Sequence, residues 1–123
     1  MNAAVDNWNV YDEFRDMVVR LTRDKVAPHA AELDRTGGPP LQAFEAFRDA
    51  GLLGLPFPEE FGGQNGDMMT QVIAIEEVAR ACLSSSFALS SGWGTLDPLM
   101  RFGSEELKQR IIPQISRGEA ISA

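Results

Sequence analysis

Residues 102–113, Phe102-Gly103-Ser104-Glu105-Glu106-Leu107-Lys108-Gln109-Arg110-Ile111-Ile112-Pro113, predict a capped helix. Ser104 is a favourable N-cap residue, two glutamates occupy the first turn, and basic residues follow. Gly118 is expected to end this helix. Residues 120–123 look like the opening of a strand, and half a strand has nothing in this sequence to pair with. We therefore expect residues 120–123 to start a strand that leads into a β domain outside this chain.

Upstream, apolar residues recur at three- and four-residue steps, as on one face of a helix. In the first predicted helix these are Val10, Phe14, Met17, Val18 and Leu21. Pro28 is expected to kink or end that helix, with the Ala-rich residues 27–33 able to resume it. The Gly-Pro stretch at residues 36–40 is a clear break. A second helix begins after it, with a proline in or beside its first turn. Its apolar side consists of Leu41, Phe44 and Phe47.

The third predicted helix begins at Asp67, a good N-cap residue. Its expected buried side is Val72, Ile75, Ala79 and Leu83, with Ile73 and Val78 alongside. We expect the opposite, ion-paired and solvated side to consist of Glu76, Glu77 and Arg80. A turn is predicted at Asp97-Pro98, ahead of the last helix. The inner stripe of that helix is expected to be Leu107, Ile111 and Ile115, with a bend at Pro113.

These patterns predict an all-α fold, an up-and-down-like bundle of about five helices. We expect residues 8–119 to form this domain and residues 1–7 to form a flexible N-terminal tail. The chain has 123 residues, 44% of them apolar, which suits one packed core.

Composition excludes several classes of function. The net charge of −7 and the scattered basic residues argue against a nucleic-acid partner. One histidine and one cysteine leave no ligand set for a structural zinc ion, and Cys82 is expected to be a buried, inert thiol. No apolar run approaches the roughly 20 residues that span a bilayer. Because no signal or transit pattern precedes residue 8, we expect a cytoplasmic protein.

Residues 84–94 are rich in serine and small residues but include Phe87, Leu89 and Trp93. Small residues on a helix allow a neighbouring backbone or a ligand to approach closely. Two interpretations follow, tight packing between helices or the lining of a ligand cleft. The Gly92-Trp93-Gly94 sequence is not a phosphate loop, because it lacks the strand-turn-helix setting.

Five of these motifs, in this order, resemble the N-terminal helical domain of the acyl-CoA dehydrogenase family. They begin with Val26-Ala27-Pro28 and the Gly-Pro break that follows. They continue with Ala50-Gly51-Leu52-Leu53-Gly54-Leu55, Pro58-Glu59-Glu60-Phe61-Gly62-Gly63, Ile75-Glu76-Glu77-Val78-Ala79-Arg80 and Phe102-Gly103-Ser104-Glu105-Glu106-Leu107-Lys108. The resemblance covers nearly the whole chain.

The resemblance implies a parent enzyme of fatty-acid β-oxidation with a further β domain and a C-terminal helical domain. That enzyme oxidises acyl-CoA to trans-2-enoyl-CoA with bound FAD, passes electrons to an electron-transfer flavoprotein, and is a homo-oligomer. The family's flavin-binding stretch and catalytic glutamate fall outside this sequence, so the resemblance implies no catalytic, cofactor-binding or metal-binding residue here. We therefore expect the chain to bind no FAD and to be inactive alone. The implied contacts with the acyl tail are Ser86, Phe87, Ser90, Ser91 and Gly94.

Two other hypotheses stay open at this point. One is a stand-alone helical interaction protein without catalysis, which should expose no large apolar patch. The other is the N-terminal domain of a flavin-dependent monooxygenase, an enzyme class that shares this architecture and differs mainly in residues outside the domain. Whether the chain is itself an enzyme is therefore uncertain from the sequence.

Overall fold

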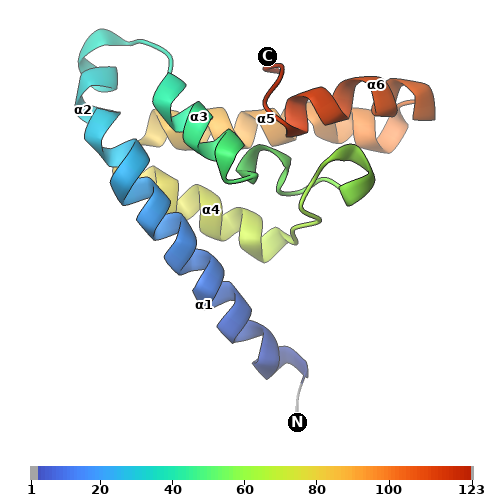
Figure 1. The fold of residues 1–123 in the computed structure, drawn as a ribbon, viewed down its shortest axis with the longest axis horizontal. Coiled ribbons are helices and arrows are strands. Elements are labelled where there is room, and N and C mark those ends of the chain that lie inside the picture. Colours follow the sequence, from blue (N-terminus) through green and yellow to red (C-terminus); the bar gives the residue numbers. More distant parts are fainter. Residues whose placement is uncertain (1–2, 123) are drawn as a thin grey trace.

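The computed structural model describes residues 3–122, which fold into helices joined by short connections (Figure 1). The α-helices are α1 (Ala3–Leu21), α2 (Ala27–Thr36), α3 (Leu41–Asp49), α4 (Met68–Ala81), α5 (Leu83–Phe102) and α6 (Glu105–Ser116). A π-helical turn, η1 (Thr22–Val26), joins α1 to α2, and two 3-10 turns, η2 (Leu52–Gly54) and η3 (Glu59–Phe61), follow α3. The described residues contain no strand, which confirms the predicted all-α class.

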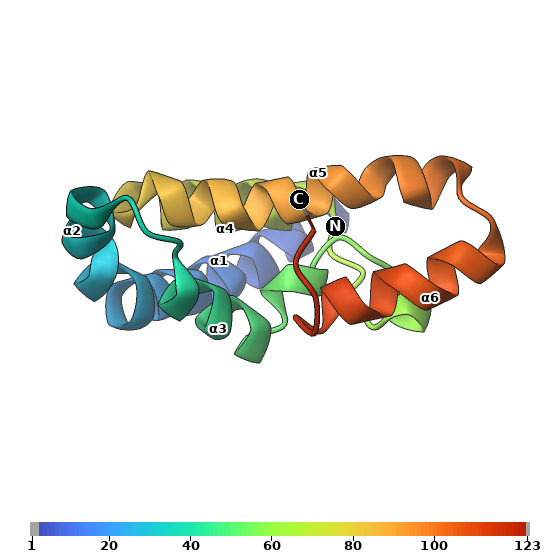
Figure 2. The ribbon, with the colours of Figure 1, turned by 90° about the horizontal axis from the view of Figure 1, so that it is seen from above.

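Helix α4 packs against both α1 and α5, and α6 folds back along α5 (Figure 1). Seen from above, α5 lies on one side of the molecule, and α3 and α6 lie on the other (Figure 2). The segment after α6 returns across the space between α3 and α5 (Figure 2). Because α5 borders so many elements, its residues decide both the packing and the exposed faces described below.

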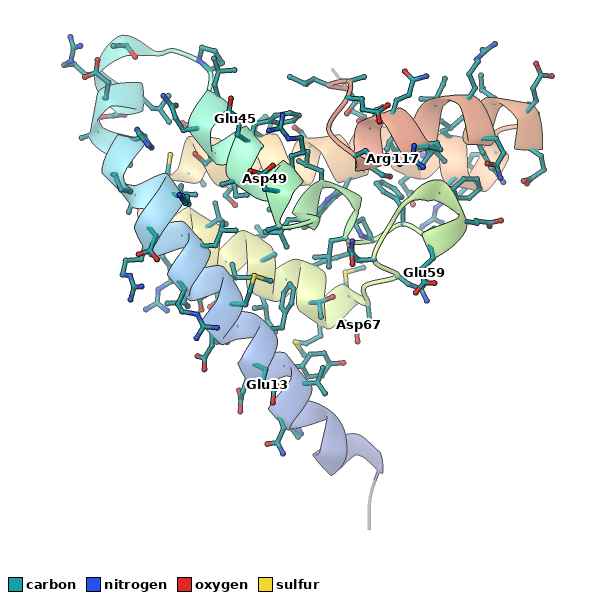
Figure 3. All side chains as sticks on the ribbon, viewed as in Figure 1. Glu13, Glu45, Asp49, Glu59, Asp67 and Arg117 are labelled. Carbon is teal, nitrogen blue, oxygen red and sulfur yellow. The ribbon has the colours of Figure 1, made fainter. Side chains whose placement is uncertain are left out.

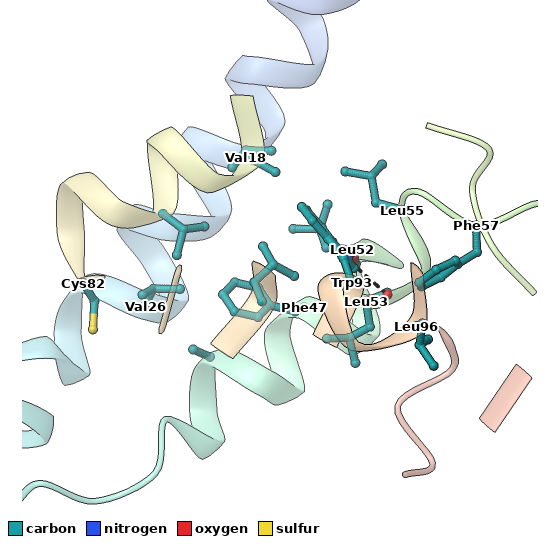
Figure 4. Packing of buried hydrophobic residues seen from close by; sticks show 14 of the residues in the cluster. Val18, Val26, Phe47, Leu52, Leu53, Leu55, Phe57, Cys82, Trp93 and Leu96 are labelled. Atoms are coloured by element: carbon teal, nitrogen blue, oxygen red, sulfur yellow. Dashed lines mark hydrogen bonds between the residues drawn. The ribbon is translucent and has the colours of Figure 1, made fainter. Parts of the chain in front are cut away.

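The core joins every layer of the fold. Val18, Phe47, Leu89 and Ile112, each from a different helix, are fully buried. Figure 4 shows the part of this core around Phe47 and Trp93. The Trp93 indole N–H donates to the carbonyl oxygens of Leu52 and Leu53, at 3.1 and 3.2 Å. A buried indole needs such a partner, so this contact fixes α5 against η2.

Pro28 neither ends the first helix nor leaves a gap in it. The helix widens into the π turn η1 and resumes as α2 at Ala27, with Pro28 in the first turn of α2. The helix continues past the proline because the π turn shifts the hydrogen bonding there: the Ala27 N–H bonds to the Thr22 carbonyl oxygen, five residues earlier. The helix then ends at Gly37, whose φ of 67° is left-handed, as the Gly-Pro break predicts.

The expected solvated face of α4 was wrong for Glu77. Its side chain is only 5% exposed and forms ion pairs with Arg15 of α1 and with Arg80, the latter at 3.5 Å. The buried line is Ile73, Ala74, Glu77 and Val78, whereas Val72 is exposed. Because α4 lies between α1 and α5, its buried arc is centred between Ala74 and Glu77 and not on the predicted line of Val72, Ile75 and Ala79. Leu83, also expected inside, belongs to α5 and is exposed.

The predicted turn at Asp97-Pro98 was also wrong, because α5 continues through Pro98. Leu96 before the proline is buried, and Leu99 and Met100 after it pack against the core. This packing on both sides outweighs the cost of the proline. In α6, which includes Pro113, Ile112 and Ser116 are buried. The predicted stripe of Leu107, Ile111 and Ile115 is only half-buried.

Both ends of the chain bear on predicted boundaries. Helix α1 begins at Ala3, so part of the predicted tail at residues 1–7 is helical, and residues 1–2 lie outside the described residues. Gly118, with a φ of 70°, ends α6 as predicted. Residues 121–122 have no regular secondary structure and Ala123 lies outside the described residues, so the strand at 120–123 stays a prediction.

Candidate functional site

Helix α5 has two faces with different chemistry. The face toward the core carries Ser85, Ser86, Leu89, Trp93 and Leu96, all of which are buried. The opposite face carries Phe87, Ser90, Ser91 and Gly94, which are exposed or half-buried. The two interpretations of the serine-rich segment therefore apply to different residues, packing for the first face and a possible ligand wall for the second.

The structure separates the five predicted tail contacts. Ser86 is buried, and its hydroxyl donates to the carbonyl oxygen of Ile75 in α4 at 2.9 Å. Ser90 and Gly94 line a groove on the outer side of α4 and α5. Ser91 lines a second, apolar cavity beside α3, while Phe87 lies on the open surface and is 71% exposed. No contact with an acyl chain is present to test them, so all five positions stay predictions.

The groove that contains Ser90 and Gly94, called here the α4–α5 groove, has a volume of about 580 Å³. Its walls include Phe57 from the loop after η2 and the side chains of Met68, Gln71 and Ile75 from α4. At one end Arg101 bonds to Asp97 at 2.8 Å. Figure 3 shows the side chains on the ribbon and labels Asp67, which directly precedes α4. Pockets of this size bind small organic groups.

Sequence reasoning missed the α4 and loop residues of this groove, and also the Asp97–Arg101 pair. The pair was hidden because a turn was expected at Asp97-Pro98, which would have taken these residues off the helix. Their spacing of four residues is the one signal that could have revealed them, since it suits an ion pair on a continuous helix.

Gly94 has no packing role within residues 3–122. A Cβ atom added there would meet no other atom within 4 Å. Glycine inside a helix costs about 1 kcal/mol relative to alanine. In addition, Pro98 lacks the N–H that would normally bond to the Gly94 carbonyl oxygen. The groove therefore contains exposed backbone at Gly94, and the stability of residues 3–122 does not depend on a glycine at this position.

Charged groups elsewhere connect α1 to α4. Arg15 bonds to both Glu76 and Glu77, and these carboxylates, Glu77 first, raise the pKa of the Arg15 guanidinium. Tyr11 donates to Asp67 at 2.5 Å, and Asp67 caps α4 by accepting from the Thr70 N–H at 2.9 Å. These carboxylates have partners within the protein, so they hold the helices together and leave no candidate general base among them.

The Tyr11–Asp67 bond predicts a pH-dependent effect of Tyr11→Phe. The Tyr11 hydroxyl, followed by the Thr70 N–H, lowers the pKa of Asp67. A carboxyl with a lowered folded-state pKa contributes stability above its unfolded pKa of about 4, and loses it as the pH falls through the folded-state pKa. Tyr11→Phe should therefore lower stability at pH 7 and make little difference near pH 2. Urea unfolding across this range measures it, and a deficit that is constant with pH would refute the assignment.

Other kinds of site find no support among the described residues. No group of three or more His, Cys, Asp or Glu side chains in residues 3–122 is placed to hold a metal ion. Cys82 is buried, as predicted, and its sulfur accepts from the Ser85 hydroxyl at 3.1 Å. In the same part of the chain, no helix has both the length and the apolar character required to cross a bilayer.

Comparison with known proteins identifies the family. Residues 10–119 match the family model described as "Acyl-CoA dehydrogenase, N-terminal domain". The chain belongs to the acyl-CoA dehydrogenase family. It is 40% identical over 111 residues to the probable acyl-CoA dehydrogenase YngJ of Bacillus subtilis, covering 89% of this chain and 29% of that protein. It is 34% identical over 110 residues to the short-chain specific acyl-CoA dehydrogenase of Clostridium acetobutylicum, again covering 89% and 29%.

Solved structures of the acyl-CoA dehydrogenase fold agree with this assignment. Butyryl-CoA dehydrogenase from Megasphaera elsdenii superposes with a TM-score of 0.80 at 24% identity, over 91% of this chain and 30% of that one, which shows the fold. A chain from a study of the electron transferring flavoprotein of Acidaminococcus fermentans superposes with a TM-score of 0.81 at 27% identity, over 90% and 30%. The sequence thus spans about three tenths of the length of these relatives.

Proposed function

We propose that this chain is the helical N-terminal domain of an FAD-dependent acyl-CoA dehydrogenase, and that α5 forms one wall of its acyl-tail slot. The match of residues 10–119 to the family's N-terminal domain is the observation that carries this proposal. The parent enzyme would oxidise acyl-CoA to trans-2-enoyl-CoA in the cytoplasm and pass electrons to an electron-transfer flavoprotein. It would act as a homo-oligomer, with the β and C-terminal helical domains supplying the chemistry.

The outward face of α5 suits an apolar tail. The hydroxyls of Ser90 and Ser91 donate back to the carbonyl oxygens of Phe87 and Ala88, both at 3.2 Å, and so are already bonded within the helix. Gly94 adds no side chain at all. A hydrocarbon tail can therefore approach these two hydroxyls closely without leaving either of them unpaired.

Exposed apolar side chains on α5 favour the domain hypothesis over a stand-alone interaction protein. Leu83, Phe87 and Phe102 are 75%, 71% and 86% exposed. Leu83 and Phe87 lie four residues apart and share one exposed face of α5, and an apolar face of this kind suits packing against another domain. The relatives from Bacillus subtilis and Clostridium acetobutylicum are named as acyl-CoA dehydrogenases, which favours dehydrogenase chemistry over that of a monooxygenase.

Neither the glycines of α5 nor the apolar cavity beside α3 fits the pyrophosphate of a flavin dinucleotide. Gly92 and Gly94 lie inside α5, where backbone N–H groups belong to the helix, and do not form a phosphate-binding loop. The apolar cavity beside α3 has a volume of only about 170 Å³ and offers no charged group for a pyrophosphate. This supports the proposal that FAD binds to other domains of the parent enzyme.

The purified chain alone is therefore expected to leave the visible spectrum of added FAD unchanged. It should also show no activity with acyl-CoA and an artificial electron acceptor. Spectra recorded before and after stoichiometric FAD provide the measurement. A shifted flavin spectrum with one FAD per chain would contradict the proposed division of roles.

A domain replacement tests the proposed function itself. Residues 10–119 of this chain would replace the matching segment of YngJ, which is 40% identical. We expect the hybrid enzyme to bind FAD and to oxidise acyl-CoA with at least about a tenth of the kcat/KM of YngJ, a loss of no more than about 1.4 kcal/mol. A folded, flavin-loaded hybrid without activity would contradict the proposal.

A further inference from the structure

A second cavity lies on the other flank of α5 and is lined by the start of α3, the middle of α5 and the segment after α6. Figure 2 shows how these three segments are arranged. Leu41 and Phe44 of α3, Ala88 and Gly92 of α5, Ile115 of α6 and Ile121 line much of it. We call it the α3–α5 cavity. It is separate from the α4–α5 groove, since the two share no lining residue.

The wall of the α3–α5 cavity selects strongly against polar ligands. None of the described residues that line it is charged. Its two hydroxyls already have partners in the protein: Ser91 donates to the Ala88 carbonyl oxygen at 3.2 Å, and Ser122 bonds to Thr95 at 2.7 Å. A polar ligand would lose its hydrogen bonds to water and gain none here.

The size of the cavity sets the size of its ligand. Its volume is about 170 Å³. An apolar cavity of about 150 Å³ engineered into another protein binds benzene, so this one accommodates about six carbon atoms. Two of its lining residues, Leu41 and Ile121, are 55% and 68% exposed, so the cavity is open to solvent on their side.

Gly92 keeps the cavity open. The nearest atom to a Cβ added at Gly92 would be the Ser122 hydroxyl oxygen, at 3.9 Å. A larger side chain therefore has room to grow into the cavity without displacing backbone. Gly92, like Gly94, lies inside a helix at a position where the packing of residues 3–122 would accept a better helix former.

We propose that the α3–α5 cavity binds an uncharged hydrocarbon group of about six carbons, at a site distinct from the α4–α5 groove. Such a group can come from a free apolar molecule or from the end of an acyl chain. The site requires neither flavin nor the proposed dehydrogenase reaction, so its test is independent of the activity of the hybrid enzyme.

The test is a titration of the whole chain with benzene, followed by NMR of isoleucine δ1 methyl groups. Ile115 lines the α3–α5 cavity and Ile75 lines the α4–α5 groove, so one labelling scheme reports on both. We expect saturable shifts at Ile115 with a dissociation constant of about 1 mM, as suits six carbon atoms, and none at Ile75. Equal shifts at both residues, or none at Ile115, would overturn the proposal.

Two comparisons sharpen this result. Gly92→Leu should weaken benzene binding at least tenfold, whereas Ser84→Leu, which adds the same side chain on the exposed start of α5, should change it less than twofold. Pyridine, which has the shape of benzene and a hydrogen-bonding nitrogen, should bind at least tenfold more weakly than benzene. Unchanged binding in Gly92→Leu, or equal affinity for pyridine, would contradict an apolar site in this cavity.

Titration with hexanoyl-CoA and with CoA then distinguishes the two sources. If hexanoyl-CoA displaces benzene and CoA does not, the ligand is the end of an acyl chain. If neither displaces benzene, the site takes free apolar molecules. Both results support the hydrocarbon site. Displacement of benzene by CoA, which carries no acyl chain, would contradict it.

Discussion

Gly63→Ala is expected to destabilise the chain by about 3–5 kcal/mol, a large part of the stability of a domain of this size. The added Cβ would lie 1.9 Å from the Phe57 carbonyl oxygen and 2.8 Å from that of Gly54. The Phe57 oxygen cannot move away freely, because it accepts from the Asn65 N–H at 2.8 Å. Urea unfolding followed by tryptophan fluorescence measures the loss.

The matched control is Gly94→Ala, the same substitution where a Cβ meets nothing within 4 Å. It should stabilise the isolated chain by up to about 1 kcal/mol, since alanine is the better helix former. The two variants thus differ in sign. If Gly63→Ala cost less than about 1 kcal/mol, the close backbone approach in the loop after η2 would be refuted.

Glu77→Ala is expected to cost about 2–3 kcal/mol, because it removes a buried side chain and its charge-assisted hydrogen bonds. The neighbouring Glu76 provides the control: it is 57% exposed and bonds to the same Arg15 at 3.2 Å. Glu76→Ala should change stability by less than about 0.5 kcal/mol. Thermal or urea unfolding of the two variants side by side decides this, and equal effects would show that Glu77 is not the buried link between α1 and α4.

Much of the fold is predictable from local pattern. Asp67 and Ser104 cap α4 and α6 through bonds to the backbone N–H groups of Thr70 and Leu107, as their residue types predict. Gly118 ends α6 with a left-handed backbone. These features depend on a few neighbouring residues, so the sequence contains the information that determines them.

The errors occur where distant residues decide the outcome. Glu76 and Glu77 are adjacent residues of one type, and Glu77 is buried because α1, about sixty residues earlier in the sequence, packs against α4. Pro98 is typical of a helix end, but the packing of Leu96 before it and of Leu99 and Met100 after it keeps the helix continuous. Periodicity shows that a helix has an apolar side without fixing which neighbours cover it.

The candidate site was predictable only in part. The family resemblance led to five positions on α5, and the structure places Ser90 and Gly94 in one groove and Ser91 in another cavity. Met68 and Gln71 of α4, which complete the α4–α5 groove, could not be found because the packing of α4 on α5 brings them there. The α3–α5 cavity depends on three elements that the sequence alone does not bring together.

The acyl-chain preference of the hybrid YngJ enzyme carrying Gly94→Leu tests the central claim most directly. If α5 forms the wall of the tail slot, the added side chain should lower kcat/KM at least tenfold for acyl chains long enough to reach Gly94, in line with roughly 1–3 kcal/mol for a small steric change in an apolar pocket. Butyryl-CoA should be least affected, and Ser84→Leu should leave the profile from C4 to C16 unchanged. A Gly94→Leu profile that matches the unsubstituted hybrid at every chain length would contradict the account.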